Sequence, residues 1–556
     1  MFGFNKFIKK AVIYTAVMLL SICFFGTVCS KDITAADTDP GIYVYIPFGE
    51  GRSVNIFPIS KGEKNYLFLP SSMSPSGVIF HYDTEKVSVT FTDGNILESD
   101  KVTDITPYLS ADTGDGSRTV KFAVTKNGVS SEYELHVMQS SDIPGIYINS
   151  SDKTRGREFV DESKSNKGSG TLTMITEAGN VVYDGELTQI KARGNTTFNA
   201  DKKAYQIKLG SSVDLTQSAG TNANKTWILL ANAYDPTLIH NTCAYDMASA
   251  FGLNSPDCRP VDLYYDGAYR GNYLLCEKVQ VGTGRVDIPD LSKDNEKANP
   301  DKDLDKLSTA TGANSYGNIY QYVTGMKTPE KYDGGYLLEL DTAYYKGERC
   351  YFITSTGVAF TVKSPENCSK EEMIYISEYV EEIVRASLNG GVCPDNEKSL
   401  WDYIDIKSLA RFFVLQETVA NADSFSSSNY FYLRPDGSAM MAGPVWDFDD
   451  SFGIREDRSS TEGFIGGAFI EPFMNLPEFR KEVKKFVNSN TYNKATGGKV
   501  DSYVSKISAS QKMNRILWNE SSQMFNKLES YDADVAYMKN FASGRVKWLK
   551  GVFATW

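Results

Sequence analysis

The stretch 421–453 gathers the side chains of this chain that are best suited to chemistry. Asp423 opens it, Asn429 follows six positions later, and Asp447 and Asp449 lie in the acidic run WDFDD. Between them come YFYL, the turn-forming RPDG and a second apolar run, a pattern that predicts a β-hairpin. Because a hairpin brings its two ends together, we expect these acids and the amide at one mouth, where their oxygens suit a hard cation such as Mg²⁺. A base Asp followed by a metal-binding Asn and Asp is also the layout of a phosphoryl-transfer site.

Two predicted helices lead into this stretch. Ser369 and Glu372 form a capping box in front of a helix with apolar residues at helical spacing. Asp405 caps the helix IKSLARFFVLQETVAN, which delivers the chain to Asp423 on a rigid base. Apolar repeats predict further helices from there to the C-terminus. Taken singly, Asp423 and Asn429 also fit turn residues that cap local backbone, and WDFDD fits a solvated acidic turn.

A second candidate group lies in KARGNTTFNADKKAYQIKL, residues 191–209. A glycine between two strand-like runs, flanked by Arg193 and by amide and hydroxyl side chains, brings backbone N–H groups close to phosphates. Alternation places the apolar residues of the returning strand on one face and its polar residues on the other. The alternative is an ordinary hairpin with solvated lysines. The lysines on or just before that strand are Lys202, Lys203 and Lys208.

The surrounding residues 143–290 are expected to be rich in strands. TLTMIT, NVVYDGEL, QIKARGNTT and AYQIKL read as strands, and Asp266-Gly267 joins PVDLYYD to YRGNYLLCEKV as a hairpin. Asp235-Pro236 predicts the N-cap and first turn of a helix over TLIHNTCAYDMASAFG. Glu277 ends the last strand, where it either contacts a ligand or leaves the sheet for solvent.

Residues 291–331 contain the polar run SKDNEKANPDKDLDKLS, which predicts an insertion or a mobile loop and not a domain. After it, GGYLLELD predicts a strand that ends in acids, and YFITSTGVAFTVKSP predicts a further pair of strands.

The length of 556 residues predicts two or three domains, and 41% hydrophobic residues supply their cores. Residues 37–142 alternate in short runs separated by turn residues, which predicts a small all-β sandwich with the role of a spacer or an adhesion module. No cluster of acids, His or Cys is visible along this part of the sequence. The net charge of −12 and the lack of a basic run argue against a nucleic-acid partner.

Residues 1–36 have the pattern of an export signal peptide. Lysines precede the apolar run AVIYTAVMLLSICFFGTV, and small residues follow at Ser30 and Ala36. The alternative is an uncleaved membrane anchor, which would be the chain's one membrane contact. Export permits disulfides among the six remaining cysteines, although the sequence does not assign pairs, and buried reduced thiols are the alternative for most of them. A zinc site is not expected, because no CxxC pair occurs and the His residues are scattered.

These motifs resemble the spore-coat protein H (CotH) kinase family. RGNTTFNADKKAYQIKL, the helix after YDPT, DGAYRGNYLLCEKV, GGYLLELD and NADSFSSSNYFYL…GPVWDFDDSFG carry the resemblance, over about residues 143–550. It implies an α+β, two-lobed atypical protein-kinase-like fold behind the β module, with 143–290 as the N-lobe and 332–556 as the C-lobe. It also implies an exported kinase that uses ATP with Mg²⁺ or Mn²⁺. Its implied substrates are Ser or Thr residues of spore-coat or cell-surface proteins.

The same resemblance implies a role for each motif residue. The first acid is the catalytic base, the amide and the next acid bind metal, and the last acid holds a second ion or a water. RGN corresponds to the loop over the nucleotide, one of two lysines reaches the phosphates, and a hairpin end leads into the hinge beside the adenine. The catalytic and metal-binding positions are Asp423, Asn429, Asp447 and Asp449. The nucleotide-binding positions are Arg193, Gly194, Asn195, Lys203 or Lys208, and Glu277.

Some features depart from ordinary kinases and keep other functions open. No HRD, DFG or GxGxxGxV occurs, and the family's PWD carries one extra residue here, as PVWD. The extra residue leaves Asp447 and Asp449 as alternatives for one ligand position. A catalytically inactive surface protein that binds through the β module is one alternative function. Transfer of AMP on the same fold is the other.

Overall fold

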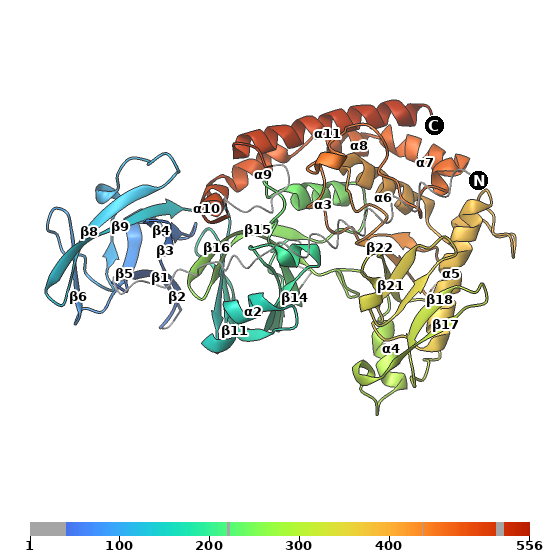
Figure 1. Ribbon diagram of the computed structural model, residues 1–556, viewed down its shortest axis with the longest axis horizontal. Helices are drawn as coiled ribbons and strands as arrows, with labels where there is room; N and C mark the ends of the chain where they lie inside the picture. Colours follow the sequence, from blue (N-terminus) through green and yellow to red (C-terminus); the bar gives the residue numbers. More distant parts are fainter. Residues whose placement is uncertain (1–39, 50, 219–222, 436, 519–526) are drawn as a thin grey trace, which may run out of the picture.

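The computed structural model describes residues 40–556 except 50, 219–222, 436 and 519–526, so the expected export signal lies outside the described residues. A β module, a β-barrel and a sheet covered by helices follow one another along the molecule (Figure 1). This mixed architecture confirms the α+β class. In the described part of the chain, no helix is both long and apolar enough to cross a membrane.

The β module has the strands that the alternation predicts, arranged in two sheets. Their orders are β2-β1-β5-β7 and β3-β4-β9-β8-β6. Leu67, Phe80 and Phe122 share one apolar core between the sheets, so the module is sandwich-like. The strands are β1 (Tyr43–Phe48), β2 (Arg52–Ile56), β3 (Ile59–Lys61), β4 (Lys64–Leu69), β5 (Val78–His81), β6 (Val87–Phe91), β7 (Val102–Thr103), β8 (Arg118–Lys126) and β9 (Val129–Gln139).

The module is fused to the rest of the molecule by a shared core. Tyr147, Tyr264 and Tyr269 of the barrel, and Met513 of α10 (Ser508–Trp518), pack into the apolar cluster of the module. The hydroxyl of Tyr264 donates to the carbonyl of Phe68 at 3.1 Å. A freely hinged spacer would leave these aromatic residues exposed, and the module is therefore an integral part of the fold.

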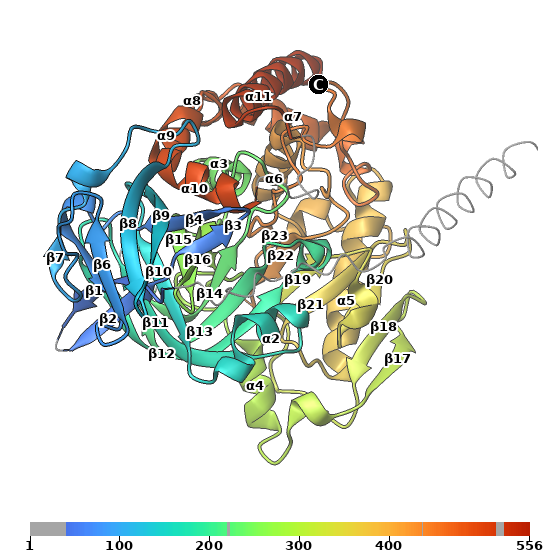
Figure 2. The ribbon, with the colours of Figure 1, turned by 60° about the vertical axis from the view of Figure 1, so that its left-hand side comes forward.

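The next strands close into a barrel in the order β10-β11-β12-β13-β14-β16-β15, which Figure 2 brings forward. Parallel pairing of β10 with β15 closes the ring. The predicted alternation holds on β13, where Tyr205 and Ile207 point into the barrel core and Lys208 is exposed. The strands are β10 (Gly145–Ser150), β11 (Gly168–Ile175), β12 (Val181–Arg193), β13 (Ala204–Val213), β14 (Asn224–Leu230), β15 (Cys258–Tyr265) and β16 (Ala268–Glu277), with α2 (Arg157–Glu162) between β10 and β11.

The helix expected at Asp235-Pro236 begins later than predicted. α3 spans His240–Ala250, and Leu238 in the preceding turn has a φ of +64°. A left-handed residue interrupts helical hydrogen bonding, so the helix starts only after it. Asp235 still stabilises the start, because its carboxylate accepts hydrogen bonds from the backbone N–H groups of Thr237 and His240, both at 2.8 Å.

The segment 291–331 is not the loop that its polar sequence predicts. It contains α4 (Leu291–Ala298) and a hairpin of β17 (Thr309–Ala313) and β18 (Ile319–Val323), and β18 pairs with β20. Tyr320 and Val323 lie in the main apolar core, and these few buried residues are enough to order a mostly polar stretch. The sheet runs β17-β18-β20-β21-β19-β22-β23, where the later strands are β19 (Tyr336–Leu340), β20 (Tyr351–Ile353), β21 (Ala359–Ser364), β22 (Asn429–Leu433) and β23 (Met441–Ala442).

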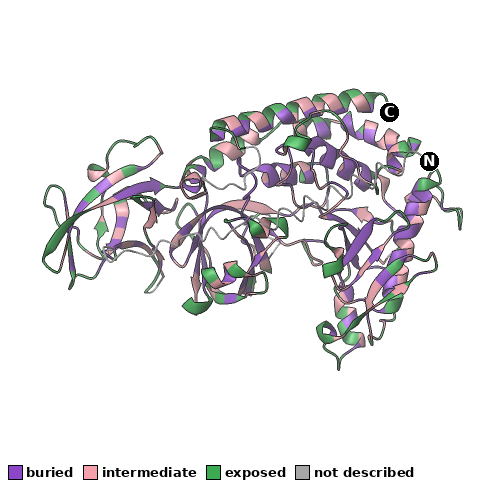
Figure 3. Cartoon of the chain, viewed as in Figure 1, coloured by how far each residue is buried: buried purple, intermediate pink, exposed green. Residues whose placement is uncertain are grey.

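Helices cover this sheet and support the stretch 421–453. The capping box of Ser369 and Glu372 starts α5 (Lys370–Leu388), and Asp405 caps α6 (Ile406–Val419) by accepting from the backbone N–H of Ser408 at 2.6 Å. α6 is buried along most of its length (Figure 3), and it packs against α3, α7 and α11. The remaining helices are α7 (Pro477–Val487), α8 (Asn490–Thr496), α9 (Val500–Lys506) and α11 (Tyr531–Ala554).

Candidate functional site

A cavity of about 710 Å³ lies between the outer face of the barrel and the second sheet, which is the sheet of β17 to β23. Its barrel wall comes from β12, β13, β14 and the loop that follows β12, and its other wall comes from β19, β21 and the loops around β22 and β23. Charged side chains line both walls. The cations are Lys164, Lys191, Arg193, Lys363 and Arg455, and the acids are Glu339, Asp341, Glu348, Asp423, Asp447, Asp449 and Asp450.

The predicted hairpin brings the acids of the stretch 421–453 together. Burial raises the pKa of Asp423 to about 6, and the charges of Asp447 and Asp450 contribute to the rise. Burial also raises the pKa of Asp449, and the negative charges of Asp447 and Asp450 raise it further. The side chains of Asp447 and Asp449 both line the cavity. Mutual repulsion of this kind requires several carboxyl groups close to one another.

The Asp423 loop is held by its own backbone and by Asn421. The carbonyl of Asp423 accepts from the backbone N–H groups of Ser426 and Ser427, each at 3.1 Å. The side-chain oxygen of Asn421 accepts from the Asp423 N–H, and its amide nitrogen donates to the carbonyl of Asp447, both at 3.2 Å. Asn421 therefore ties the two acidic loops together, a role that its sequence position alone does not indicate.

The Asp447 loop is held from α3 and from Ser428. The backbone N–H of Phe448 donates to the side-chain oxygen of Asn241 at 2.9 Å. The hydroxyl of Ser428 donates to a carboxylate oxygen of Asp447 at 3.0 Å. The backbone of Asp447 has a φ of +67°. His240 contacts the carbonyl of Asp449 through Nδ1 at 3.3 Å. Residues far apart in the sequence thus fix the direction of these carboxylates.

Left-handed backbone conformations concentrate in the same stretch. Such a conformation costs a residue other than glycine about 1–3 kcal/mol, and it persists only where the surrounding structure enforces it. Residues of this kind cluster at active sites and ligand clamps. Those in and beside the two acidic loops are Ala420, Phe425, Ser428, Asp447 and Phe452.

Asn429 lies beneath the loop and does not line the cavity. Its amide nitrogen donates to the carbonyls of Asp423, at 3.2 Å, and of Ser427, while its oxygen accepts from Gln416 at 3.4 Å. These contacts make Asn429 a residue that positions the Asp423 loop. The Asn429 side chain therefore does not face the cavity, where the expected metal ligand would have to lie.

The RGN loop lines the cavity as predicted. Gly194 has a φ of +105°, and a Cβ atom there would collide with the hydroxyl of Thr197, so the loop requires glycine. The guanidinium of Arg193 lies 5.3 Å from the ring centroid of Trp446, which brings the two walls into contact. Asn195 completes the predicted set on this wall.

The other predicted nucleotide contacts lie outside the cavity lining. Lys203 donates to the carbonyl of Phe198 at 2.7 Å and covers that ring, and Lys208 is exposed farther along β13. Glu277 is buried beside Arg285, with 3.5 Å between their closest charged atoms. Residue type alone does not show which lysines reach the cavity, because a strand extends past a bound ligand in both directions.

Lys164, Lys191 and Lys363 are the lysines of the cavity that sequence reasoning missed. Lys191 is two positions before Arg193 on β12, and alternation places both on one face, a signal present in KAR. Lys363 on β21 donates to Glu348 at 2.7 Å and lies 3.4 Å from Glu339. Burial raises the pKa of Glu339 more than Lys363 lowers it.

The acids fit a divalent cation, although no preformed cage is present. Among the described residues, no group of three or more His, Cys, Asp or Glu side chains is gathered as a metal site. Mg²⁺, however, is usually held by one or two carboxylates together with substrate phosphates. Asp447 and Asp449 supply such a pair, and Oδ1 of the neighbouring Asp450 is buried with no hydrogen-bond partner. Arg455 is paired with Asp450 at 3.1 Å and offsets part of the negative charge.

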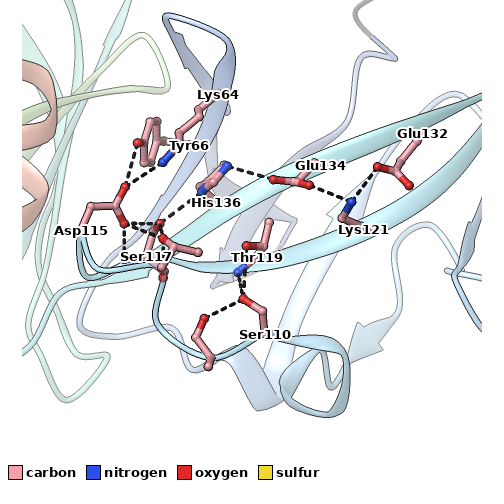
Figure 4. Close-up of polar contacts among 12 residues, drawn as sticks. Lys64, Tyr66, Ser110, Asp115, Ser117, Thr119, Lys121, Glu132, Glu134 and His136 are labelled. Carbon is pink, nitrogen blue, oxygen red and sulfur yellow. Dashed lines mark hydrogen bonds and ion pairs between the residues drawn. The ribbon is translucent and has the colours of Figure 1, made fainter.

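The β module contains a polar cluster that the sequence did not reveal (Figure 4). The hydroxyl of Ser117 lies 3.2 Å from Nδ1 of His136, and Nε2 of His136 lies 3.0 Å from Glu134. This resembles the order of groups in a serine hydrolase. Ser117 is fully buried, however, and its hydroxyl bonds Asp115 at 2.5 Å. A nucleophile must reach its substrate, so the cluster is structural.

The profile of the CotH kinase protein family matches residues 190–549, so the chain belongs to the CotH kinase family. Membership in this family indicates a kinase-like function. No curated protein matches the chain.

Proposed function

We propose that this protein is a kinase with a two-lobed, protein-kinase-like body, which transfers the γ-phosphoryl group of ATP to Ser or Thr hydroxyls of other proteins. The observation that carries the proposal is the division of charge across one cavity. Lys191 and Arg193 face it from the barrel, and Asp423 and Asp447 face it from the second sheet. A triphosphate needs cations around its oxygens, and phosphoryl transfer depends chiefly on positioning and charge neutralisation.

Different residues of the chain would bind the phosphates, the proton of the acceptor hydroxyl and the metal. Lys191, Arg193 and Lys363 would bind phosphate oxygens, and the RGN loop would offer backbone N–H groups beside them. Asp423, with a pKa of about 6, is ionised at neutral pH and would accept the proton of the attacking hydroxyl. Asp447 and Asp449 would hold Mg²⁺ or Mn²⁺, which supplies charge neutralisation on the phosphates when it is bound.

The test uses the full chain, because the β module shares its core with the barrel. The protein is incubated with a mixture of cell-surface proteins and with ATP labelled either at the γ- or at the α-phosphate, with Mg²⁺ or Mn²⁺. We expect protein-bound γ-label on Ser or Thr, lost in Asp423→Asn and Asp447→Asn. Asp395→Asn is the matched control, because Asp395 is a surface acid paired with Arg385.

Each alternative has its own result. Incorporation of the α-label would show AMP transfer on the same site. No transfer, together with no change in thermal stability on adding ATP and Mg²⁺, would show an inactive surface protein. Transfer that persists in both Asp423→Asn and Asp447→Asn would overturn the assignment of the site.

We also propose that the protein is exported and acts on spore-coat or cell-surface proteins. The N-terminal sequence pattern supports export, and the resemblance to the spore-coat protein H family supports a coat or surface setting. N-terminal sequencing of protein recovered from the medium, the envelope and spores is the measurement. A start near residue 31 or 37 is expected, and recovery of the intact chain from the cytoplasm alone would contradict export.

A further inference from the structure

Two buried cysteines, Cys350 and Cys368, lie close together where the chain leaves the second sheet and enters α5. Cys350 directly precedes β20, and Cys368 directly precedes the N-cap residue of α5. The backbone N–H of Cys368 donates to the sulfur of Cys350 at 3.2 Å, and the thiol of Cys368 donates to the carbonyl of Pro365 at 3.4 Å. Their exposed fractions are 1% and 0%, inside the main apolar core.

We propose that Cys350 and Cys368 form a disulfide when the chain folds in an oxidising environment. The inference does not depend on the proposed phosphoryl transfer. It assigns one pair among the cysteines, which the sequence leaves unassigned, and it identifies a covalent link across the sheet that carries Lys363.

The backbone on both sides already holds the two cysteines together. The carbonyl of Cys350 accepts from the N–H of Val362 at 2.9 Å, and the carbonyl of Cys368 accepts from the N–H of Val323 at 2.8 Å. Both cysteines are thus tied to neighbouring strands of one sheet. An S–S bond is about 2.05 Å long and demands side chains that face each other. The sulfur of Cys350 already contacts the backbone of Cys368, so a change in side-chain torsions brings the two sulfur atoms together.

The chemistry balances with a low-molecular-weight disulfide, such as oxidised glutathione, as the oxidant. One cysteine thiolate attacks the oxidant and releases one small thiol. The second cysteine thiolate then attacks the mixed disulfide and releases the other small thiol. The chain loses two protons and two electrons in forming its S–S bond, and the oxidant gains both to become two small thiols.

The burial of the pair determines when the bond forms. Burial raises the pKa of the Cys368 thiol, and its hydrogen bond with Cys350 raises it further. The thiolate that exchange requires is therefore scarce in the folded chain. The bond should form while the chain folds, before the core closes, and then resist small reductants.

The bond would join residues 18 positions apart, and β21 lies between them. A link of this length restricts the unfolded chain and stabilises the folded one. It would hold the start of β20 to the start of α5, and the carbonyl of Cys350 pairs there with the N–H of Val362, next to Lys363.

Peptide mapping tests the pairing directly. The full chain is refolded in a glutathione redox buffer, its free thiols are blocked, and its peptides are analysed by mass spectrometry before and after reduction. We expect a linked peptide pair that joins Cys350 to Cys368 and disappears on reduction. Blocked thiols at both positions, or a bond from either cysteine to a different partner, would overturn the proposal.

Thermal unfolding gives the second measurement. The oxidised wild type should melt about 3 °C above the reduced form, because a bond that contributes about 3 kcal/mol shifts the melting temperature of so large a chain by only a few degrees. This difference should vanish in Cys350→Ala and in Cys368→Ala, and it should persist in Cys393→Ala, a buried cysteine elsewhere in the core. An undiminished difference in either of the first two variants would refute the assignment. If those variants do not fold, the mapping of the wild type decides.

Discussion

Replacing Arg545 by methionine should destabilise the protein strongly, because this arginine neutralises a buried carboxylate. Arg545 on α11 and Glu417 on α6 have exposed fractions of 1% and 0% at their side chains, and their closest charged atoms are 2.6 Å apart. Nε of the arginine also donates to the carbonyl of Glu417 at 2.7 Å, and Nη1 donates to the carbonyls of Thr461 and Gly463. The carboxylate accepts further bonds from the N–H groups of residues 465 and 466.

The magnitude follows from what the substitution leaves behind. Methionine fills much of the space but leaves Glu417 buried without its cation, and breaking a buried pair in this way costs about 3–5 kcal/mol. Burial already raises the pKa of Glu417 despite Arg545, so the carboxyl should respond by binding a proton. The double variant Arg545→Met with Glu417→Gln should recover part of the loss, because no charge is then left unpaired.

Urea unfolding followed by tryptophan fluorescence measures the effect. Lys539→Met is the matched control, because it removes a surface ion pair with Asp501 from the same helix and should cost about 0–1 kcal/mol. If Arg545→Met and Lys539→Met lose the same small amount, the network does not hold α11 to α6. If the double variant is less stable than Arg545→Met, the uncompensated charge is not the cause.

Three other substitutions test the site and its surroundings. Lys363→Met should weaken ATP binding about 10- to 100-fold in calorimetry, since it removes a charge-assisted bond, whereas Lys208→Met, outside the cavity, should change it less than twofold. Gly194→Ala should lower both the unfolding midpoint and ATP affinity more than Gly179→Ala, which has a φ of +83° but open space around it; equal losses would rule out the predicted collision. Burial raises the pKa of Glu277 to about 7 in the folded chain, above its ordinary value of 4.5, so its contribution to stability is full below pH 4.5 and is lost as the pH rises through 7. Urea titrations should therefore show wild type losing up to about 3 kcal/mol more than Glu277→Gln between pH 4.5 and 8, and parallel curves would contradict this.

Local sequence signals predicted most elements of the fold. The capping box at Ser369, the cap at Asp405 and the Asp266-Gly267 turn each act within a few residues, and the structure contains all three. Where a distant contact decides the outcome, local reading was wrong. Residues 291–331 are ordered by burying a few apolar side chains against strands that come later in the chain. Leu238 delays α3 because the surrounding structure holds it in a left-handed conformation.

The site residues also fall into two groups, those that the local sequence predicts and those that only distant contacts place. Asp423, Asp447 and Asp449 could be found from residue type and from the hairpin between them, because a hairpin fixes its own geometry. Lys363 could not, since it lies on a strand that pairs with β19 and β20, and nothing in its local sequence indicates which face meets the cavity. Asn429 is the opposite case, because its type fits a metal ligand and only the contacts with Gln416 and the Asp423 loop show that it points elsewhere.

The contacts described above show which parts of the fold the family match includes and which parts precede it. It begins at residue 190, one position before Lys191, and it ends at residue 549 within α11, beyond Arg545. The matched segment therefore contains every residue that lines the cavity except Lys164, together with the buried ion pair that holds α11 to the helix leading into Asp423. β10 and β11, which close the barrel, precede it, and the β module whose core they share precedes them. Residues outside the matched segment thus complete the fold of the barrel wall, and changes at the module interface should reach the cavity through barrel stability rather than through direct contact.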